Sequence, residues 1–157
     1  MMKIIGKEGI SGIIEWVINL ILIGGIGIWI SLPWSLPWLI MKIKPSHVND
    51  KKFFWFIILF LYITGILANW IVYETRNFFH SINQNTPFIY ENVKSLRNIG
   101  YSSFVISVFF AIKIAYYPTI LTIVMTMTFI IIGFFGIVVA EVFRQAVDVK
   151  LENDLTI

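Results

Sequence analysis

Three ionisable residues lie inside long apolar stretches of the chain, namely Glu15, Lys113 and Glu141. If these stretches cross a membrane, a charge at the bilayer centre costs roughly 3 kcal/mol, and residues of this kind commonly form proton or ion pathways. Glu15 and Glu141 lie about one turn from the ends of their stretches, and Lys113 lies about one turn before Pro118. All three side chains can reach the interface, so we expect interfacial anchors. One alternative stays open, in which Glu15 and Glu141 form a polar pair between neighbouring helices.

The remaining residues show no pattern typical of catalysis or of metal binding. The chain has no cysteine, and His47 and His80 fall in segments that we expect on opposite sides of the membrane. No HExxH, GxSxG or P-loop pattern occurs. The only polar groups expected at mid-depth of the membrane are Ser107, Thr126 and Thr128. We therefore expect no catalytic residue, no metal, no cofactor and no enzymatic activity.

The composition indicates a membrane protein. Of the 157 residues, 58% are hydrophobic and 13% are charged, whereas soluble domains carry roughly 25% charged residues. The mean hydropathy is +0.83. The net charge of +3 is spread over the chain without a long basic run, so we expect no direct contact with nucleic acid. The lipid bilayer is the partner that this composition predicts.

The apolar stretches predict an all-α, integral membrane four-helix bundle that forms a single membrane domain over 1–157. A helix needs about 20 residues to cross the hydrocarbon core. The stretch from Ile99 to Phe143 is about twice that length, so it must fold back, and Pro118 favours a hairpin near its middle. The predicted spans are 12–32, 53–73, 101–117 and 120–143.

The polar segments between the spans predict three further elements. Prolines at positions 33, 37 and 45 indicate an irregular loop between the first two spans. Between spans two and three, we expect a short amphipathic helix at 87–99, with Thr86 as its N-cap and Gly100 as its stop. This helix would lie on the cytoplasmic leaflet. Residues 144–157 should continue span four as a cytoplasmic tail.

The distribution of Lys and Arg favours an orientation. Four crossings place both termini on one side, and that side carries seven Lys and Arg residues against five on the other. Because cytoplasmic loops are enriched in these residues, we expect cytoplasmic termini.

Two segments have a distinctive pattern, NTPFIYENVKSLRNIGY at 85–101 and QAVDVKLENDLTI at 145–157. They resemble segments of the bacterial four-span membrane family called domain of unknown function 2975. The resemblance is carried by Pro87, Phe88, Glu91, Asn92, Val93, Leu96, Arg97, Ile99, Gly100, Ala146, Val147, Asp148, Glu152, Asn153, Asp154, Leu155 and Thr156. It implies a multi-pass protein of the bacterial cytoplasmic membrane, often encoded beside a small helix-turn-helix regulator, and it implies no established activity.

Our first hypothesis is a non-catalytic sensory or regulatory membrane module that works with a cytosolic helix-turn-helix regulator. Its candidate interaction residues come from the middle helix and the tail: Phe88, Glu91, Asn92, Leu96, Arg97, Asp148, Glu152, Asn153 and Asp154. The alternative hypothesis is a small transporter, channel or immunity-type protein that binds a hydrophobic or cationic molecule. Self-association into a homo-oligomer is compatible with both hypotheses.

Overall fold

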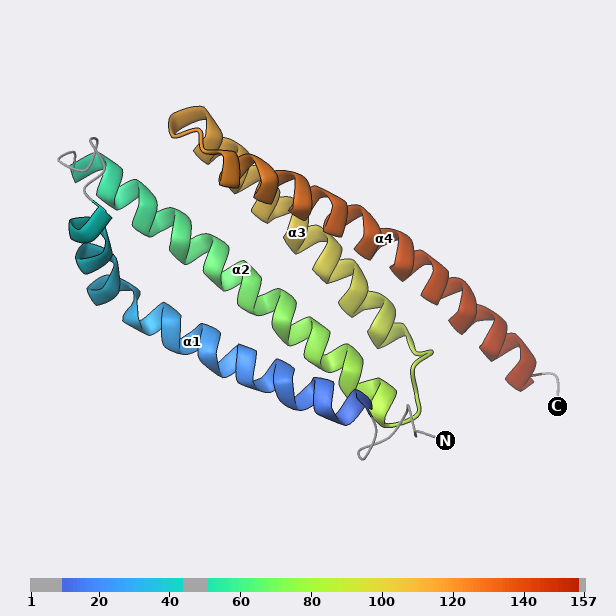
Figure 1. The fold of residues 1–157 in the computed structure, drawn as a ribbon. Coiled ribbons are helices and arrows are strands. Elements are labelled where there is room, and N and C mark those ends of the chain that lie inside the picture. Colours follow the sequence, from blue (N-terminus) through green and yellow to red (C-terminus); the bar gives the residue numbers. More distant parts are fainter. Residues whose placement is uncertain (1–9, 44–50, 156–157) are drawn as a thin grey trace.

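The computed structural model describes residues 10–43 and 51–155 of the chain, with side chains from 12 to 38 and from 53 to 155. These residues form helices throughout, joined by two short connections, and no strand occurs among them (Figure 1). The helices are α1 (Ile10–Ile43), α2 (Lys51–Asn83), α3 (Tyr90–Tyr116) and α4 (Ile120–Leu155). The predicted all-α class with four long helices is confirmed.

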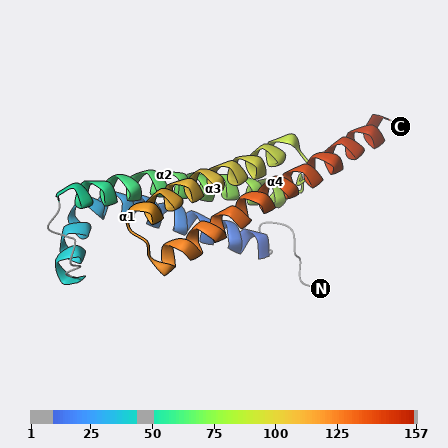
Figure 2. The ribbon, with the colours of Figure 1, turned by 90° about the horizontal axis from the view of Figure 1, so that it is seen from above.

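The four helices lie side by side in an open row, in chain order (Figures 1 and 2). Within the described residues, backbone contacts join α1 to α2, α2 to α3 and α3 to α4, and no other pair of helices. One ring contact, between Phe78 and Phe143, connects α2 with α4. Because α1 and α4 are not neighbours, the alternative that paired Glu15 with Glu141 is wrong.

The two ends of the row consist of different segments of the chain. The start of α1, the α2–α3 connection and the end of α4 lie together, and we call this the termini end (Figure 1). The α3–α4 turn lies at the opposite end, which we call the hairpin end. This turn comprises Tyr117, Pro118 and Thr119, so the hairpin predicted at Pro118 is confirmed.

Each helix is long and apolar enough to cross a bilayer. The candidate spans contain 27, 31, 27 and 36 residues, more than the roughly 20 that a crossing requires. Large apolar side chains cover the outside of the row; Ile120 and Phe135 of α4, for example, are 83% and 69% exposed. Water would penalise this surface, whereas lipid tails would not.

The irregular loop predicted after span one is wrong up to Ile43, because α1 continues through Pro33 and Pro37. Each proline removes one helical hydrogen bond but leaves the others in place. The ribbon changes direction in this part of α1 (Figure 1). Leu32 and Leu36, on either side of Pro33, are buried, and their burial offsets part of the cost of the prolines. The predictions for Pro45 and His47 lie outside the described residues.

The separate amphipathic helix predicted at 87–99 is also wrong, since these residues mostly belong to the first turns of α3. The helix begins at Tyr90, with Ile89 in the N-cap position, so Thr86 does not cap it. It passes Gly100 without interruption and ends at Tyr116. The segment packs between α2 and α4 rather than lying on the membrane surface, because Asn92, Val93 and Ser95 are buried.

Gly100 belongs to a close backbone contact between α3 and α4, not to a helix end. A methyl group placed on Gly136 of α4 would lie 3.0 Å from the Gly100 Cα atom. A methyl group on Gly100 would lie 3.0 Å from the carbonyl oxygen of Gly133. The backbones of α3 and α4 therefore touch, which is how helices associate where lipid removes the hydrophobic advantage of burial.

Candidate functional site

The termini end collects polar side chains from all four helices. The cause is the length of α2, which continues ten residues past the predicted end of span two at Tyr73. Glu74, Arg76, His80 and Asn83 therefore lie on a helix, where sequence reasoning placed a loop. Residues three or four apart on a helix share a face, so these side chains divide between the α1 side and the α3 side.

On the α1 side, Glu15 has two partners on α2. His80 Nδ1 lies 2.9 Å from Glu15 Oε1, and Asn83 Nδ2 donates to Glu15 Oε2 at 2.5 Å. Arg76 Nε donates to Asn19 Oδ1 at 2.6 Å, one helical turn further along. Glu15 was predicted as an interfacial anchor; in the structure it also connects the start of α1 with the end of α2.

On the α3 side, α2 and α3 flank an open cavity of about 380 Å³. We call it the α2–α3 cavity. Apart from Ile89, its lining residues all have polar or charged side chains, although carbon atoms form much of the lining surface: Glu74, Asn77, His80, Ser81, Gln84, Ile89, Glu91, Asn92, Lys94, Ser95 and Asn98. This volume lies in the range of about 300–1,000 Å³ that is usual for small-molecule sites.

Two hydrogen-bonded groups build the wall of the α2–α3 cavity. Glu74 is 6% exposed, and Asn98 Nδ2 donates to its Oε1 at 2.7 Å. Asn92 is 2% exposed; it accepts from Ser81 Oγ at 2.8 Å and donates to the Pro87 carbonyl at 2.7 Å. Asn92 therefore fixes the connection between α2 and α3, whereas Glu74 places a carboxylate at the cavity.

The predicted interaction residues divide between the two faces of α3. Glu91 and Asn92 line the α2–α3 cavity. The other side of α3 contacts α4, where Leu96 packs on the buried cluster of Val93, Ala140 and Val147. Phe88, in the α2–α3 connection, also contacts α4, because its ring lies 5.7 Å from that of Phe143.

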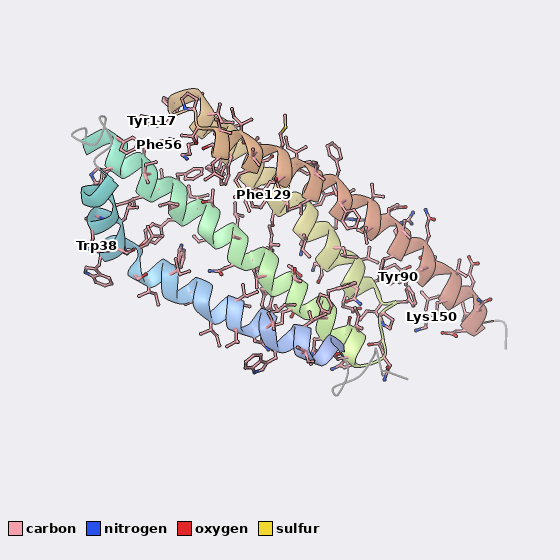
Figure 3. All side chains as sticks on the ribbon, viewed as in Figure 1. Trp38, Phe56, Tyr90, Tyr117, Phe129 and Lys150 are labelled. Atoms are coloured by element: carbon pink, nitrogen blue, oxygen red, sulfur yellow. The ribbon has the colours of Figure 1, made fainter. Side chains whose placement is uncertain are left out.

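Polar contacts connect α3 with α4 near the exposed C-terminal end of α4. Tyr90 Oη donates to Asp148 Oδ1 at 2.5 Å, and Arg97 Nη2 lies 3.9 Å from Glu141 Oε2. Along α4, Arg144 contacts Glu141 at 2.5 Å and Asp148 at 3.5 Å, because residues three and four apart share one face of a helix. Of these contacts, Tyr90–Asp148 and Arg97–Glu141 join the two helices, whereas both Arg144 pairs lie within α4. Figure 3 shows Tyr90 of α3 beside α4 at the termini end.

Lys113 lies near the hairpin end, far from the acids of the termini end, as the sequence predicted. Its Nζ donates to Thr122 Oγ1 at 3.0 Å and lies 5.6 Å from the centre of the Phe60 ring. No ion pair to Lys113 occurs among the residues that the structure describes. The same residues contain no group of three or more His, Asp or Glu side chains arranged to hold a metal ion.

Sequence reasoning missed Glu74 and Asn98, the two residues that build the acidic wall of the cavity. A signal was present, because Glu74, Asn77, Ser81 and Gln84 follow one another at helical spacing after the apolar stretch of span two. Such a polar stripe indicates that the helix continues and that one of its faces meets another polar surface.

Four long apolar helices that expose their apolar side chains define a multi-span membrane protein. The chain belongs to the family described as Protein of unknown function (DUF2975), whose model matches residues 38–157. It is similar to the uncharacterized membrane protein YoaS of Bacillus subtilis (strain 168), with 29% identity over 112 residues, which cover 64% of this chain and 70% of that protein. No solved structure matches the chain. The family resemblance seen in the two sequence segments is thereby confirmed.

Proposed function

We propose that the chain is a non-catalytic regulatory module of the bacterial cytoplasmic membrane. In this proposal the termini end faces the cytosol, and the last two turns of α4 bind a cytosolic helix-turn-helix regulator. Orientation follows from the excess of Lys and Arg expected on the side of the termini. The kind of partner follows from what the family resemblance implies.

The main support for the proposal is an apolar stripe on α4 that continues beyond the part of α4 that α3 covers. Val147, Leu151 and Leu155 are four residues apart and share one face of α4. Val147 is 2% exposed where α3 covers it, but Leu151 and Leu155 are 45% and 85% exposed. Figure 2 shows this end of α4 extending past the other helices. An amphipathic helix of this kind is a common ligand for a hydrophobic groove on a partner protein.

The base of this stripe is held by the contacts that also position α3. Tyr90 binds Asp148 one residue after Val147, and the opposite face of α3 lines the α2–α3 cavity. Since α3 contacts both α2 and α4, a change in the packing of α2 against α3 would also alter the contacts at the partner-binding end of α4. This arrangement suits a sensory role better than transport. Transport requires an enclosed path, and the described helices form an open row that does not surround one.

Co-purification in a nonionic detergent tests the proposal, using the helix-turn-helix regulator encoded by a neighbouring gene. Replacing Leu151 and Leu155 by Ala should weaken capture of the regulator. A buried Leu contributes roughly 2 kcal/mol more than Ala, so each substitution should raise Kd by about 30-fold.

The matched control is the double substitution of Ile120 and Leu121 by Ala, at the other end of the same helix. These residues are 83% and 67% exposed and should leave capture unchanged. Equal capture by the Leu151 and Leu155 variant and by the unmodified chain would refute the proposal. A flux assay in liposomes provides a second test, because a regulatory module predicts no substrate-dependent flux.

A further inference from the structure

The α2–α3 cavity contains a buried carboxylate that lacks a cationic partner in the described part of the chain. Glu74 is 6% exposed, and its hydrogen bond comes from the neutral amide of Asn98. None of the ion pairs between described residues involves Glu74. Burying an unpaired charge is strongly unfavourable, so a carboxylate in this position calls for a cation from outside.

We propose that the α2–α3 cavity binds a small organic cation, a primary ammonium or guanidinium group, with Glu74 as its counter-ion. The volume of about 380 Å³ accommodates a small molecule. An ammonium group brings three hydrogen-bond donors and a guanidinium group five, and neither accepts a hydrogen bond. The amide and hydroxyl oxygens of Asn77, Ser81 and Gln84 lie on the same wall and can accept these additional bonds.

The other charged groups of the cavity leave Glu74 as the determining charge. Glu91 and Lys94 are both exposed and lie three residues apart on α3, so their formal charges offset each other. His80 lies at the edge facing α1, where Nδ1 faces Glu15 and Nε2 lies 2.9 Å from the Gln84 amide. A cation that enters the cavity therefore meets one uncompensated negative charge, at the buried wall.

A single metal ion fits this cavity less well than an organic cation. Hard cations such as Ca²⁺ take six to eight oxygen ligands, usually with several carboxylates. The described residues contain no cluster of three or more His, Asp or Glu side chains that could hold such an ion. The cavity offers one buried carboxylate surrounded by neutral hydrogen-bonding groups. It also has an apolar contact in Ile89, which suits the alkyl part of an amine.

Calorimetric titration of the full chain in nonionic detergent tests this site with three probes of similar size: n-butylammonium, n-butylguanidinium and the neutral n-butyramide. We expect the two cations to bind with Kd on the order of 1 mM, as befits such small ligands, and butyramide to bind at least 10-fold more weakly. This comparison uses unmodified protein. Equal binding of butyramide, or no binding of either cation at 20 mM, would show that the cavity is not a cation site.

The Glu74→Gln variant assigns the interaction to one residue. Gln preserves the shape of the side chain and can still accept from Asn98, but it removes the charge. We expect at least a 10-fold loss of affinity for both cations and no change for butyramide. Asp154→Asn is the matched control, because Asp154 is an exposed acid at the termini end that does not line the cavity. Cation binding that survives Glu74→Gln unchanged would overturn the assignment to Glu74.

Discussion

Replacing Gly136 by Ala should destabilise the contact between α3 and α4, although the same substitution usually stabilises a helix. In an exposed helix interior, Ala is favoured over Gly by about 1 kcal/mol. At Gly136, the added methyl group would lie 3.0 Å from the Gly100 Cα, 3.1 Å from the Gly100 nitrogen and 3.2 Å from the Leu96 carbonyl oxygen. All three are backbone atoms, which cannot rotate away, so the helices must separate by about 0.5–1 Å to restore ordinary contact distances.

The cost of that separation can be worked from the packing around it. Forcing an extra methyl group into a close-packed contact typically costs about 1–3 kcal/mol. Residues that meet across the same interface, including Ser103 and Ala140, are fully buried and would lose part of their dispersion contacts. After subtraction of the helix-propensity gain, we expect Gly136→Ala to lower the free energy of unfolding by up to about 2 kcal/mol, and by about 1–3 kcal/mol relative to the same substitution at an uncrowded helical glycine.

Reversible unfolding in mixed detergent micelles, followed by circular dichroism, measures this difference. Gly24→Ala in α1 is the control, because a methyl group at Gly24 meets nothing within 4 Å. The control should be neutral or slightly stabilising. Gly100→Ala perturbs the same contact, so combining it with Gly136→Ala should cost less than the sum of the two single effects. If Gly136→Ala proves as stable as Gly24→Ala, the close backbone contact between α3 and α4 is refuted.

Three further predictions concern the termini end and the orientation. Arg76→Ala removes the guanidinium bond to α1 and should lower the free energy of unfolding by about 1–2 kcal/mol, measured by the same detergent titration. Arg144→Ala removes only exposed ion pairs within α4 and should change it less. Tyr90→Phe removes the hydroxyl bond to Asp148 and should speed amide hydrogen exchange in the last turns of α4, with α1 as the internal reference; unaltered exchange would count against the contact. Single cysteines at the exposed positions Lys94 and Thr119 should react with an impermeant thiol reagent from opposite faces of the membrane, and labelling from one face would contradict the four-span topology.

The number of helices and the α3–α4 turn were predictable from the sequence, whereas several helix ends were not. Long apolar stretches and Pro118 are sufficient to define four spans, because a bilayer imposes a minimum length on each. Hydropathy cannot show where a helix stops once it leaves the apolar region. Glu74 and Asn98 resemble loop residues in the sequence, and only their mutual contact shows that they face each other on two helices.

Gly100 shows a second kind of ambiguity. A glycine after an amphipathic segment is typical of a helix end, and the same residue is also typical of close helix packing. Which of the two roles Gly100 has depends on Gly133 and Gly136, which are more than thirty residues away in the sequence. Likewise, the polar contacts of Glu15 with His80 and Asn83 depend on the pairing of α1 with α2, which the apolar pattern of each helix does not specify.

The order of the helices in the row has a consequence for biogenesis. In the described part of the chain, α2, α3 and α4 each make backbone contacts with the helix synthesised just before, so packing can proceed while the ribosome is still translating. Contacts between sequence neighbours also close short loops, which favours rapid folding. Among the described residues, α1 makes backbone contacts only with α2, so the segment from α2 to α4 retains its own contacts when α1 is altered or packs late.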